Sequence, residues 1–237
     1  MKIQLARRMA AEFLGTAFLV AAVIGSGIMG ERLAGGNAAI ALLANTIATG
    51  AALVALILAF GPISGAHFNP VVTLADWIEA GATRADAIGY ACAQILGGAS
   101  GAMVANMMFG LTAVSISHHA PRSGAAQMFS EFIATFGLLS VIWGCAKAKT
   151  GMAAFAVGGY ITAAYWFTAS TSFANPVVTI ARSLSDTFAG IRPQDVTGFI
   201  VAQVAGALAA TYVFRWIMPG IAVVAKNVML PHETEQE

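Results

Sequence analysis

The sequence predicts an all-α membrane protein with six transmembrane helices and two re-entrant half-helices. Three observations predict this fold: the composition, six long stretches without charged residues, and an internal repeat that contains two identical pentapeptides. Of 237 residues, 58% are hydrophobic and 10% are Asp, Glu, Lys or Arg, against about 25% charged residues in an ordinary soluble domain. A single water-soluble globule is therefore not expected.

The scarcity of charged and reactive residues excludes several function classes. The 12 basic and 11 acidic residues are too scattered to form the basic stripe of a nucleic-acid surface, so we expect no nucleic-acid partner. Cys92 and Cys145 lie in apolar stretches, and we interpret them as packing residues. We find no metal-ligand set, no nucleophile with its base and no phosphate-binding glycine loop, so neither catalysis nor a cofactor is expected.

Six windows without charged residues define the predicted spans. A helix needs about 20 residues to cross the hydrocarbon core of a bilayer. Two of the windows have 43 and 32 residues, so each must hold a span and a further apolar segment. The windows are Phe13–Gly30, Leu33–Ala75, Ala87–Pro121, Phe132–Ala146, Thr150–Ala181 and Val196–Phe214.

The distribution of Lys and Arg predicts the orientation in the membrane. Six spans place both termini on one side, and that side carries eight of the 12 basic residues. By the positive-inside rule both termini lie in the cytoplasm, and we expect the protein in the cytoplasmic (inner) membrane. The eight are Lys2, Arg7, Arg8, Arg84, Lys147, Lys149, Arg215 and Lys226, and the other four are Arg32, Arg122, Arg182 and Arg192.

The two ends of the chain need separate interpretation. The first 30 residues resemble a signal peptide, because basic residues precede an apolar run. We expect this segment to be retained, since the run is long and Glu12 near its start has a counterpart later in the chain. The acidic segment Pro231–Glu237 is expected to be a loose tail.

Three signatures occur twice in the same order, which indicates an internal repeat. The pentapeptide Asn-Pro-Val-Val-Thr starts at Asn69 and again at Asn175. The Glu-Phe-x-x-Thr element at Glu12 returns at Glu131, and an Ala-Gln-x-x-Gly element at residues 93–97 returns at 202–206. We place the copies at about 9–115 and 127–217. Because each holds three spans, the second crosses the membrane in the opposite sense, which makes an inverted repeat.

Each Asn-Pro pair has the chemistry of a helix start. Asparagine is a preferred N-cap, and proline is favoured at the first helical position because its missing N–H has no partner there. From Pro70 an apolar pattern runs to about Glu79, and from Pro176 to about Leu184. About ten residues make ~15 Å of helix, half of a bilayer core. Two half-helices therefore enter from opposite faces, and we expect their asparagines to meet near the midplane.

The segments that lead into the half-helices are predicted to be irregular. Residues 61–65 contain Gly-Pro and Ser-Gly, and residues 170–172 read Ser-Thr-Ser. Irregular backbone is tolerated at membrane depth only where it lines a cavity or is buried in protein. The simplest structure that meets these conditions is a pore.

On these residues the chain resembles the aquaporins (major intrinsic proteins). The resemblance extends from Glu12 to about Arg215 and rests on the paired Asn-Pro boxes, the Ser-Gly-Ala-His-Phe-Asn-Pro approach at residues 64–70 and the duplicated Glu and Ala-Gln-x-x-Gly elements. It implies a passive channel, without cofactor, that assembles as a homotetramer with one pore per subunit. It also implies that Asn69 and Asn175 direct amide donors into the lumen, where the positive ends of the half-helices oppose cations and protons.

The resemblance implies a second constriction toward the extracellular side. Spacing from the asparagines places it at Thr49, Ala163, Ser172 and Val178. Position 178 is usually arginine in the family, and water-selective and glycerol-conducting members carry aromatic residues at this constriction. None of the four residues here is aromatic or charged, so the resemblance implies a wide filter without arginine.

Five ionisable residues complete the candidate site. Glu12 and Glu131 lie within spans, where a carboxylate invites a functional hypothesis, but the resemblance implies that they accept backbone N–H bonds from the irregular segments. His67 is expected either to support this segment, with its carbonyl or ring toward the lumen, or to be merely packed. Asp76 and Arg182 lie seven residues after the two asparagines and are expected in the vestibules, either as surface charges or as groups that attract solute.

The sequence therefore predicts a passive channel for water and small uncharged solutes, such as glycerol-like polyols and hydroxylated metalloid acids like arsenous acid. An ion-coupled secondary transporter is the alternative, because such proteins also combine inverted repeats with broken helices. It would need a carboxylate near the bilayer centre, and only Glu12 and Glu131 could serve.

Overall fold

The computed structural model describes residues 3–118, 121–148 and 152–220, so the predicted acidic tail and the basic residues Lys2, Lys149 and Lys226 lie outside the described residues. The described residues form eight helices and no strand. In chain order the helices are α1 (Leu5–Leu33), α2 (Ala38–Ser64), α3 (Pro70–Ile78), α4 (Arg84–Met108), α5 (Ala125–Ala148), α6 (Ala153–Phe167), α7 (Pro176–Arg182) and α8 (Pro193–Ile217).

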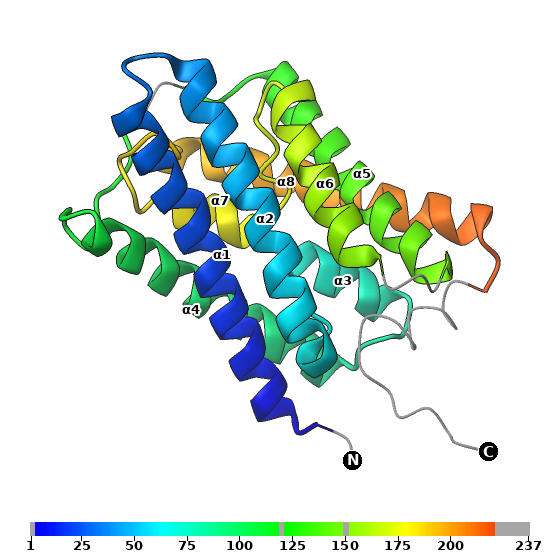
Figure 1. Ribbon diagram of the computed structural model, residues 1–237. Helices are drawn as coiled ribbons and strands as arrows, with labels where there is room; N and C mark the ends of the chain where they lie inside the picture. The colour runs from blue at the N-terminus through cyan, green and yellow to red at the C-terminus, as the bar shows by residue number, and fades with distance from the viewer. Residues whose placement is uncertain (1–2, 119–120, 149–151, 221–237) are drawn as a thin grey trace.

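The helices are arranged as two similar halves, which confirms the predicted inverted repeat. In the first half α1 packs against α2 and α4, and in the second α5 packs against α6 and α8. The short helices cross over: α3 contacts α8 of the other half and α7 contacts α4. In Figure 1 α7 lies near the middle of the view, and α3 lies to the lower right beside the end of α2. The half-helices begin at Pro70 and Pro176, as the Asn-Pro signal predicts.

Five of the helices are long and apolar enough to cross a membrane: α1, α2, α4, α5 and α8. The sixth predicted span, α6, has 15 residues, which at the α-helical rise is about 22 Å, less than the ~30 Å of a bilayer core. It packs between α2 and α5. Beyond Phe167 the chain continues as an irregular segment that leads to α7.

The end of α2 differs from the sequence prediction. Residues 61–64 were expected to be irregular, but α2 continues through Pro62 to Ser64 and ends at Gly65, which has a left-handed φ of 87°. Proline in the last turn removes one helical hydrogen bond, and tertiary contacts hold the turn in place: the Ser64 hydroxyl donates to Glu12 over 2.7 Å, and the Tyr90 hydroxyl donates to the Ser64 carbonyl over 2.7 Å. The irregular segment is therefore residues 65–69.

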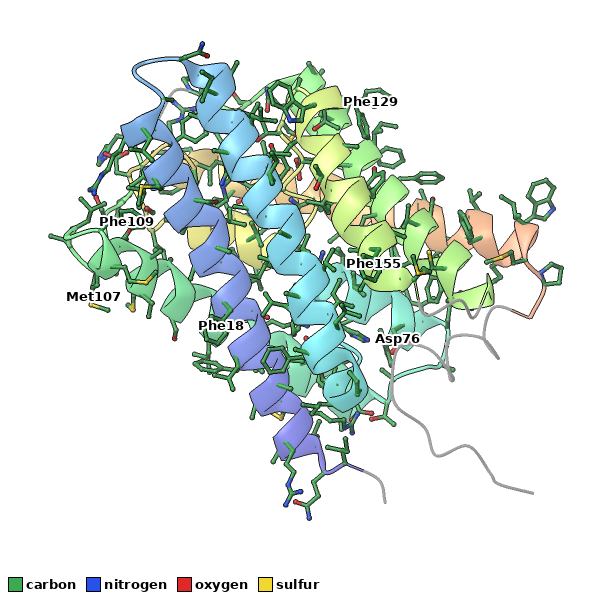
Figure 2. All side chains as sticks on the ribbon, in the orientation of Figure 1. Phe18, Asp76, Met107, Phe109, Phe129 and Phe155 are labelled. Carbon is green, nitrogen blue, oxygen red and sulfur yellow. The ribbon has the colours of Figure 1, made fainter. Side chains whose placement is uncertain are left out.

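The outer surface is apolar and the interior contains polar groups, as expected for a protein surrounded by lipid. Phe18, Phe129 and Phe155, from three different helices, are 60%, 65% and 50% exposed, and they lie on the outside in Figure 2. Two glutamates and two glutamines are completely buried: Glu12, Gln94, Glu131 and Gln203. Unpaired polar groups are costly in such an environment, so the hydrogen bonds of these four residues are central to the fold.

Candidate functional site

A cavity of about 210 Å³ lies between the two halves and is lined by both. Both irregular segments contribute consecutive residues to its wall, 65–69 from the first half and 172–175 from the second. The remaining wall is mostly apolar and comes from α1, α2, α5, α6 and the two half-helices. The cavity has room for several water molecules or one small solute.

Asn69 and Asn175 meet in the wall of this cavity in a reciprocal arrangement. The Asn69 amide donates to the carbonyl of Ala174 over 2.8 Å, and the Asn175 amide donates to the carbonyl of Phe68 over 2.8 Å. The side-chain oxygen of each asparagine also caps its own half-helix, accepting from the N–H of Val71 in one case and of Val177 in the other. Each NH₂ group has a second hydrogen, so one donor on each residue remains for a solute.

The two irregular segments have the same backbone conformation. The residue three before each asparagine has a positive φ, 51° at Ala66 and 49° at Ser172, and the residue directly before it has 50° at Phe68 and 48° at Ala174. A left-handed φ is unfavourable for residues with a side chain, by roughly 1–2 kcal/mol each. Such strain persists only where surrounding contacts hold it.

Buried carboxylates hold these segments. Glu12 accepts from the backbone N–H groups of His67 at 2.9 Å and Phe68 at 2.7 Å. Glu131 accepts from Phe173 and Ala174 in the same way, both at 2.9 Å. Each carboxylate thus binds the peptide groups next to the residues with positive φ.

The three repeated sequence signatures meet in one hydrogen-bond network in each half. Gln94 donates to Glu12 over 2.8 Å and to the Thr73 hydroxyl over 3.1 Å. Gln203 donates to Glu131 over 2.6 Å and to Thr179 over 2.8 Å. The repeat was visible in the sequence, but the contact between its parts was not, because they are far apart in the chain.

The lining residues of α2 and α6 recur at every fourth position, which marks one face of each helix. On α2 they are Thr49, Leu53, Ile57 and Gly61, and on α6 they are Ala153, Val157, Ile161 and Tyr165. Of the predicted filter residues, Thr49, Ser172 and Val178 line the cavity and are buried.

The predicted position of Ala163 is wrong. Ala163 is exposed and lies outside the cavity wall, which Tyr165 occupies instead. Two residues along a helix correspond to a rotation of about 200°, so Ala163 points away from the wall. The Tyr165 hydroxyl lies 3.4 Å from that of Thr49. The cavity wall therefore contains a tyrosine at a place where the sequence predicts no aromatic residue.

The vestibule positions expected for Asp76 and Arg182 also need correction. Both side chains are buried, with residue exposures of 0% and 2%. Arg182 lines the cavity and Asp76 does not, although both lie seven residues after an asparagine. Asp76 lies in the second turn of α3, and Figure 2 labels it toward the lower right of the view. The sequence pattern predicts that the two residues occupy equivalent positions on the half-helices. It does not predict that the ends of these half-helices are buried.

The ring of His67 is engaged inside the protein. Its Nδ1 lies 3.0 Å from the Thr73 hydroxyl, and its Nε2 lies 3.7 Å from the Asp76 carboxylate. The ring also packs edge-on against Tyr90 at 5.3 Å and 71°. In the other half Phe173 takes the place of His67 and packs against Phe199 at 5.1 Å and 70°. The two irregular segments therefore share one geometry but differ in chemistry at this position.

This arrangement, an inverted repeat with two half-helices whose asparagines meet in a cavity, defines a membrane channel protein. The sequence model of the major intrinsic protein family matches residues 1–157 of this chain. The aquaglyceroporin AqpS of Rhizobium meliloti is 49% identical over 217 residues, which cover 92% of each chain. Aquaporin AqpM of Methanothermobacter thermautotrophicus is 31% identical over 91% of this chain and 98% of its own. The chain belongs to the major intrinsic protein family.

A comparison with solved structures supports the same fold. The structure of the aquaglyceroporin from Plasmodium falciparum matches with a TM-score of 0.73 and 20% identity, covering 93% of this chain and 100% of the other. At this identity the match establishes the arrangement of the helices. The choice of solute depends on the residues of this chain.

Proposed function

We propose that this protein is a passive channel for water and small uncharged solutes of about the size of glycerol. The observation that carries the proposal is the cavity between the halves, with the amides of Asn69 and Asn175 in its wall. The relative named aquaglyceroporin, which is 49% identical, supports glycerol-like solutes. Hydroxylated metalloid acids such as arsenous acid, which are small, neutral and hydroxylated, belong to the same proposal.

Four residues of the cavity wall near Val178 support passage of solutes larger than water. Thr49, Ser172 and Val178 have short side chains, and we propose that they form the filter together with Tyr165. The hydroxyl groups can exchange hydrogen bonds with a polyol, while Val178 faces its carbon atoms. Selectivity in such pores depends on diameter and on the donors and acceptors of the wall.

The contacts of the buried carboxylates favour a channel over an ion-coupled transporter. Glu12 and Glu131 are the acidic residues that a transporter would use, and each accepts two backbone N–H bonds and one glutamine N–H bond. We propose that both act as supports for the irregular segments. Neither contributes to the cavity wall within the described residues.

Flux into sealed vesicles tests the proposal. Purified protein is reconstituted into liposomes, and stopped-flow light scattering measures the entry of water, glycerol and arsenous acid without any ion gradient. We expect faster entry of water and glycerol than in protein-free vesicles. Solute accumulation that depends on a proton or sodium gradient, with no flux in its absence, would establish the transporter instead.

Orientation and assembly are also part of the proposal. We propose a multi-pass protein of the inner membrane with both termini in the cytoplasm. Arg8, which pairs with Asp86 at 2.6 Å, and Arg215, which pairs with Glu79 at 2.8 Å, are two of the eight basic residues that we assign to the cytoplasmic side. By family resemblance we propose a homotetramer with one pore per subunit. The mass of the detergent-solubilised protein, corrected for bound detergent, tests the assembly.

A further inference from the structure

Arg182 is the last residue of α7 and reaches the cavity from one helical turn beyond Val178. The residue is 2% exposed, and among the described residues that line the cavity it carries the only Arg, Lys, Asp or Glu side chain. Residues four apart lie on the same face of a helix. Arg182 and Val178 therefore face the same part of the cavity.

The guanidinium of Arg182 is held in a fixed position. Its Nε donates to the carbonyl of Ala189, and its Cζ lies 3.5 Å from the centre of the Phe173 ring, a cation–π geometry. Phe173 is itself fixed against Phe199. The Nη1 atom is buried and has no hydrogen-bond partner among the described residues. Arg182 therefore places a fixed cation in the cavity wall.

No acidic residue in the described part of the cavity wall balances the charge of Arg182. Asp76, the equivalent residue of the first half, lies outside the wall, within 3.7 Å of His67. A second guanidinium, that of Arg122, lies 5.4 Å from the same Phe173 ring, but Arg122 does not line the cavity. An unbalanced charge in a narrow pore repels ions of the same sign and attracts acceptor oxygens.

We propose that Arg182 is the fixed positive charge of the constriction, placed one turn away from position 178. In this role it excludes cations, and its positive charge attracts the acceptor oxygens of the permeating solute, as in polyols, urea and oxyacids. The Thr49 and Ser172 hydroxyls lie in the same wall and complete a site for an oxygen-bearing solute. The inference rests on the proposed channel function, because it concerns the selectivity of that pore.

The test compares two solutes of nearly identical shape and different charge: urea and the guanidinium cation. Their permeabilities are measured in sealed vesicles for the wild type and for Arg182→Met, and the guanidinium-to-urea ratio cancels differences in abundance or pore width. We expect this ratio to rise about tenfold or more in Arg182→Met, as the loss of one buried charge interaction implies. Arg182→Lys retains the charge and should keep the wild-type ratio.

Two further variants separate the lumen charge from a structural role. Arg122→Met removes a cation that contacts the same aromatic ring but lies outside the cavity wall. The guanidinium-to-urea ratio should therefore stay within about twofold of wild type, a change smaller than the loss of a charged hydrogen bond would cause. In the double variant Val178→Arg with Arg182→Met the charge returns one turn earlier, and low guanidinium permeability should return with it. A purely structural clamp on Ala189 would not be restored by this exchange.

Arg182→Gln provides a second neutral variant if Arg182→Met does not fold, because glutamine can still donate to the Ala189 carbonyl. An unchanged ratio in a folded neutral variant overturns the proposal. An equal rise in Arg122→Met, or no restoration in the folded double variant, overturns it as well. Wild-type vesicles that pass neither water nor urea faster than protein-free vesicles would instead refute the proposed channel function, which is a separate result.

Discussion

Asn69 and Asn175 each cap their own half-helix and donate to the backbone of the opposite half, so each asparagine joins the two copies of the repeat. The donor and acceptor functions lie on different atoms of one amide. The oxygen accepts the cap N–H, and the nitrogen binds the carbonyl across the junction. Variants can therefore remove one function and leave the other.

The asparagine variants should separate capping from pore formation. Loss of an N-cap costs about 0.5–2 kcal/mol, and Asn69→Ala or Asn175→Ala also loses the bond across the junction, so permeability per inserted molecule should fall. Asn69→Asp keeps the cap acceptor for the Val71 N–H but cannot donate to the Ala174 carbonyl. Its flux should fall at least as far as that of Asn69→Ala. Stopped-flow permeability at matched abundance measures both effects.

Asn37 provides the control for these variants. It caps α2 through its side-chain oxygen, which accepts from Ala39 at 3.0 Å and Ile40 at 3.2 Å, and it is exposed. Asn37→Ala loses a comparable cap far from the cavity and should leave permeability per molecule unchanged. Equal flux in Asn69→Ala, Asn175→Ala and the wild type would remove the asparagines from the permeation path.

The carboxylates should act on stability rather than on conduction. In Glu12→Gln or Glu131→Gln one acceptor oxygen becomes an NH₂ group that faces a backbone N–H, and a buried unsatisfied donor costs about 1–3 kcal/mol. We expect a lower thermal unfolding temperature in detergent, with residual flux per folded molecule. Glu31→Gln, at an exposed position of α1, is the control. Normal stability with complete loss of flux would instead indicate a coupled carboxylate.

Two equivalent glycines permit the contact between long helices in each half. A Cβ atom on Gly97 would lie 2.3 Å from the Phe13 carbonyl, and one on Gly206 would lie 2.4 Å from the Phe132 carbonyl. Overpacking of this kind costs about 1–3 kcal/mol, so Gly97→Ala and Gly206→Ala should lower thermal stability. A Cβ on Gly144 would meet no atom of the described residues within 4 Å. If Gly144→Ala lowered the thermal stability as much as Gly97→Ala and Gly206→Ala do, overpacking at the close helix contact would not explain the loss of stability.

Local signals predicted the half-helices well, and tertiary effects account for what was missed. The Asn-Pro pairs predicted the starts at Pro70 and Pro176, and the observed ends at Ile78 and Arg182 fall within two residues of the expected ones. Pro62 is a local breaker signal as well, but contacts of Ser64 with Glu12 and Tyr90 keep its turn helical. A sequence pattern carries no information on such contacts.

The rotation of a helix about its axis was the main source of error at the candidate site. Counting back from Asn175 led to Ala163, whereas the wall is formed by residues at every fourth position up to Tyr165. Every face of α6 has its own series of residues four apart, and α6 is apolar on all sides. The sequence pattern therefore does not distinguish the face toward the cavity from the outer face. The burial of Arg182 was missed because it depends on residues 183–191, which fold over the end of α7.

Val178→Arg tests whether position 178 lies in the permeation path. Val178 is 6% exposed and lines the cavity beside Thr49 and Ser172, whose short side chains leave room for a longer residue. Tyr165 leaves less room than the alanine expected there, and Arg182 one turn away adds a like charge, which is unfavourable at this spacing. We therefore expect a folded protein of reduced stability with a narrower and more positive pore.

The expected result of Val178→Arg is a shift of selectivity toward water. Glycerol has the larger cross-section, so its permeability should fall more than that of water, and we expect the glycerol-to-water ratio to drop about tenfold, which corresponds to ~1.4 kcal/mol of added barrier. Val178→Met introduces a neutral side chain that is longer than valine but shorter than arginine, and it should give a smaller drop. Both ratios come from stopped-flow measurements on vesicles with equal protein content. An unchanged or raised ratio in Val178→Arg at normal abundance would place position 178 outside the path of the solute.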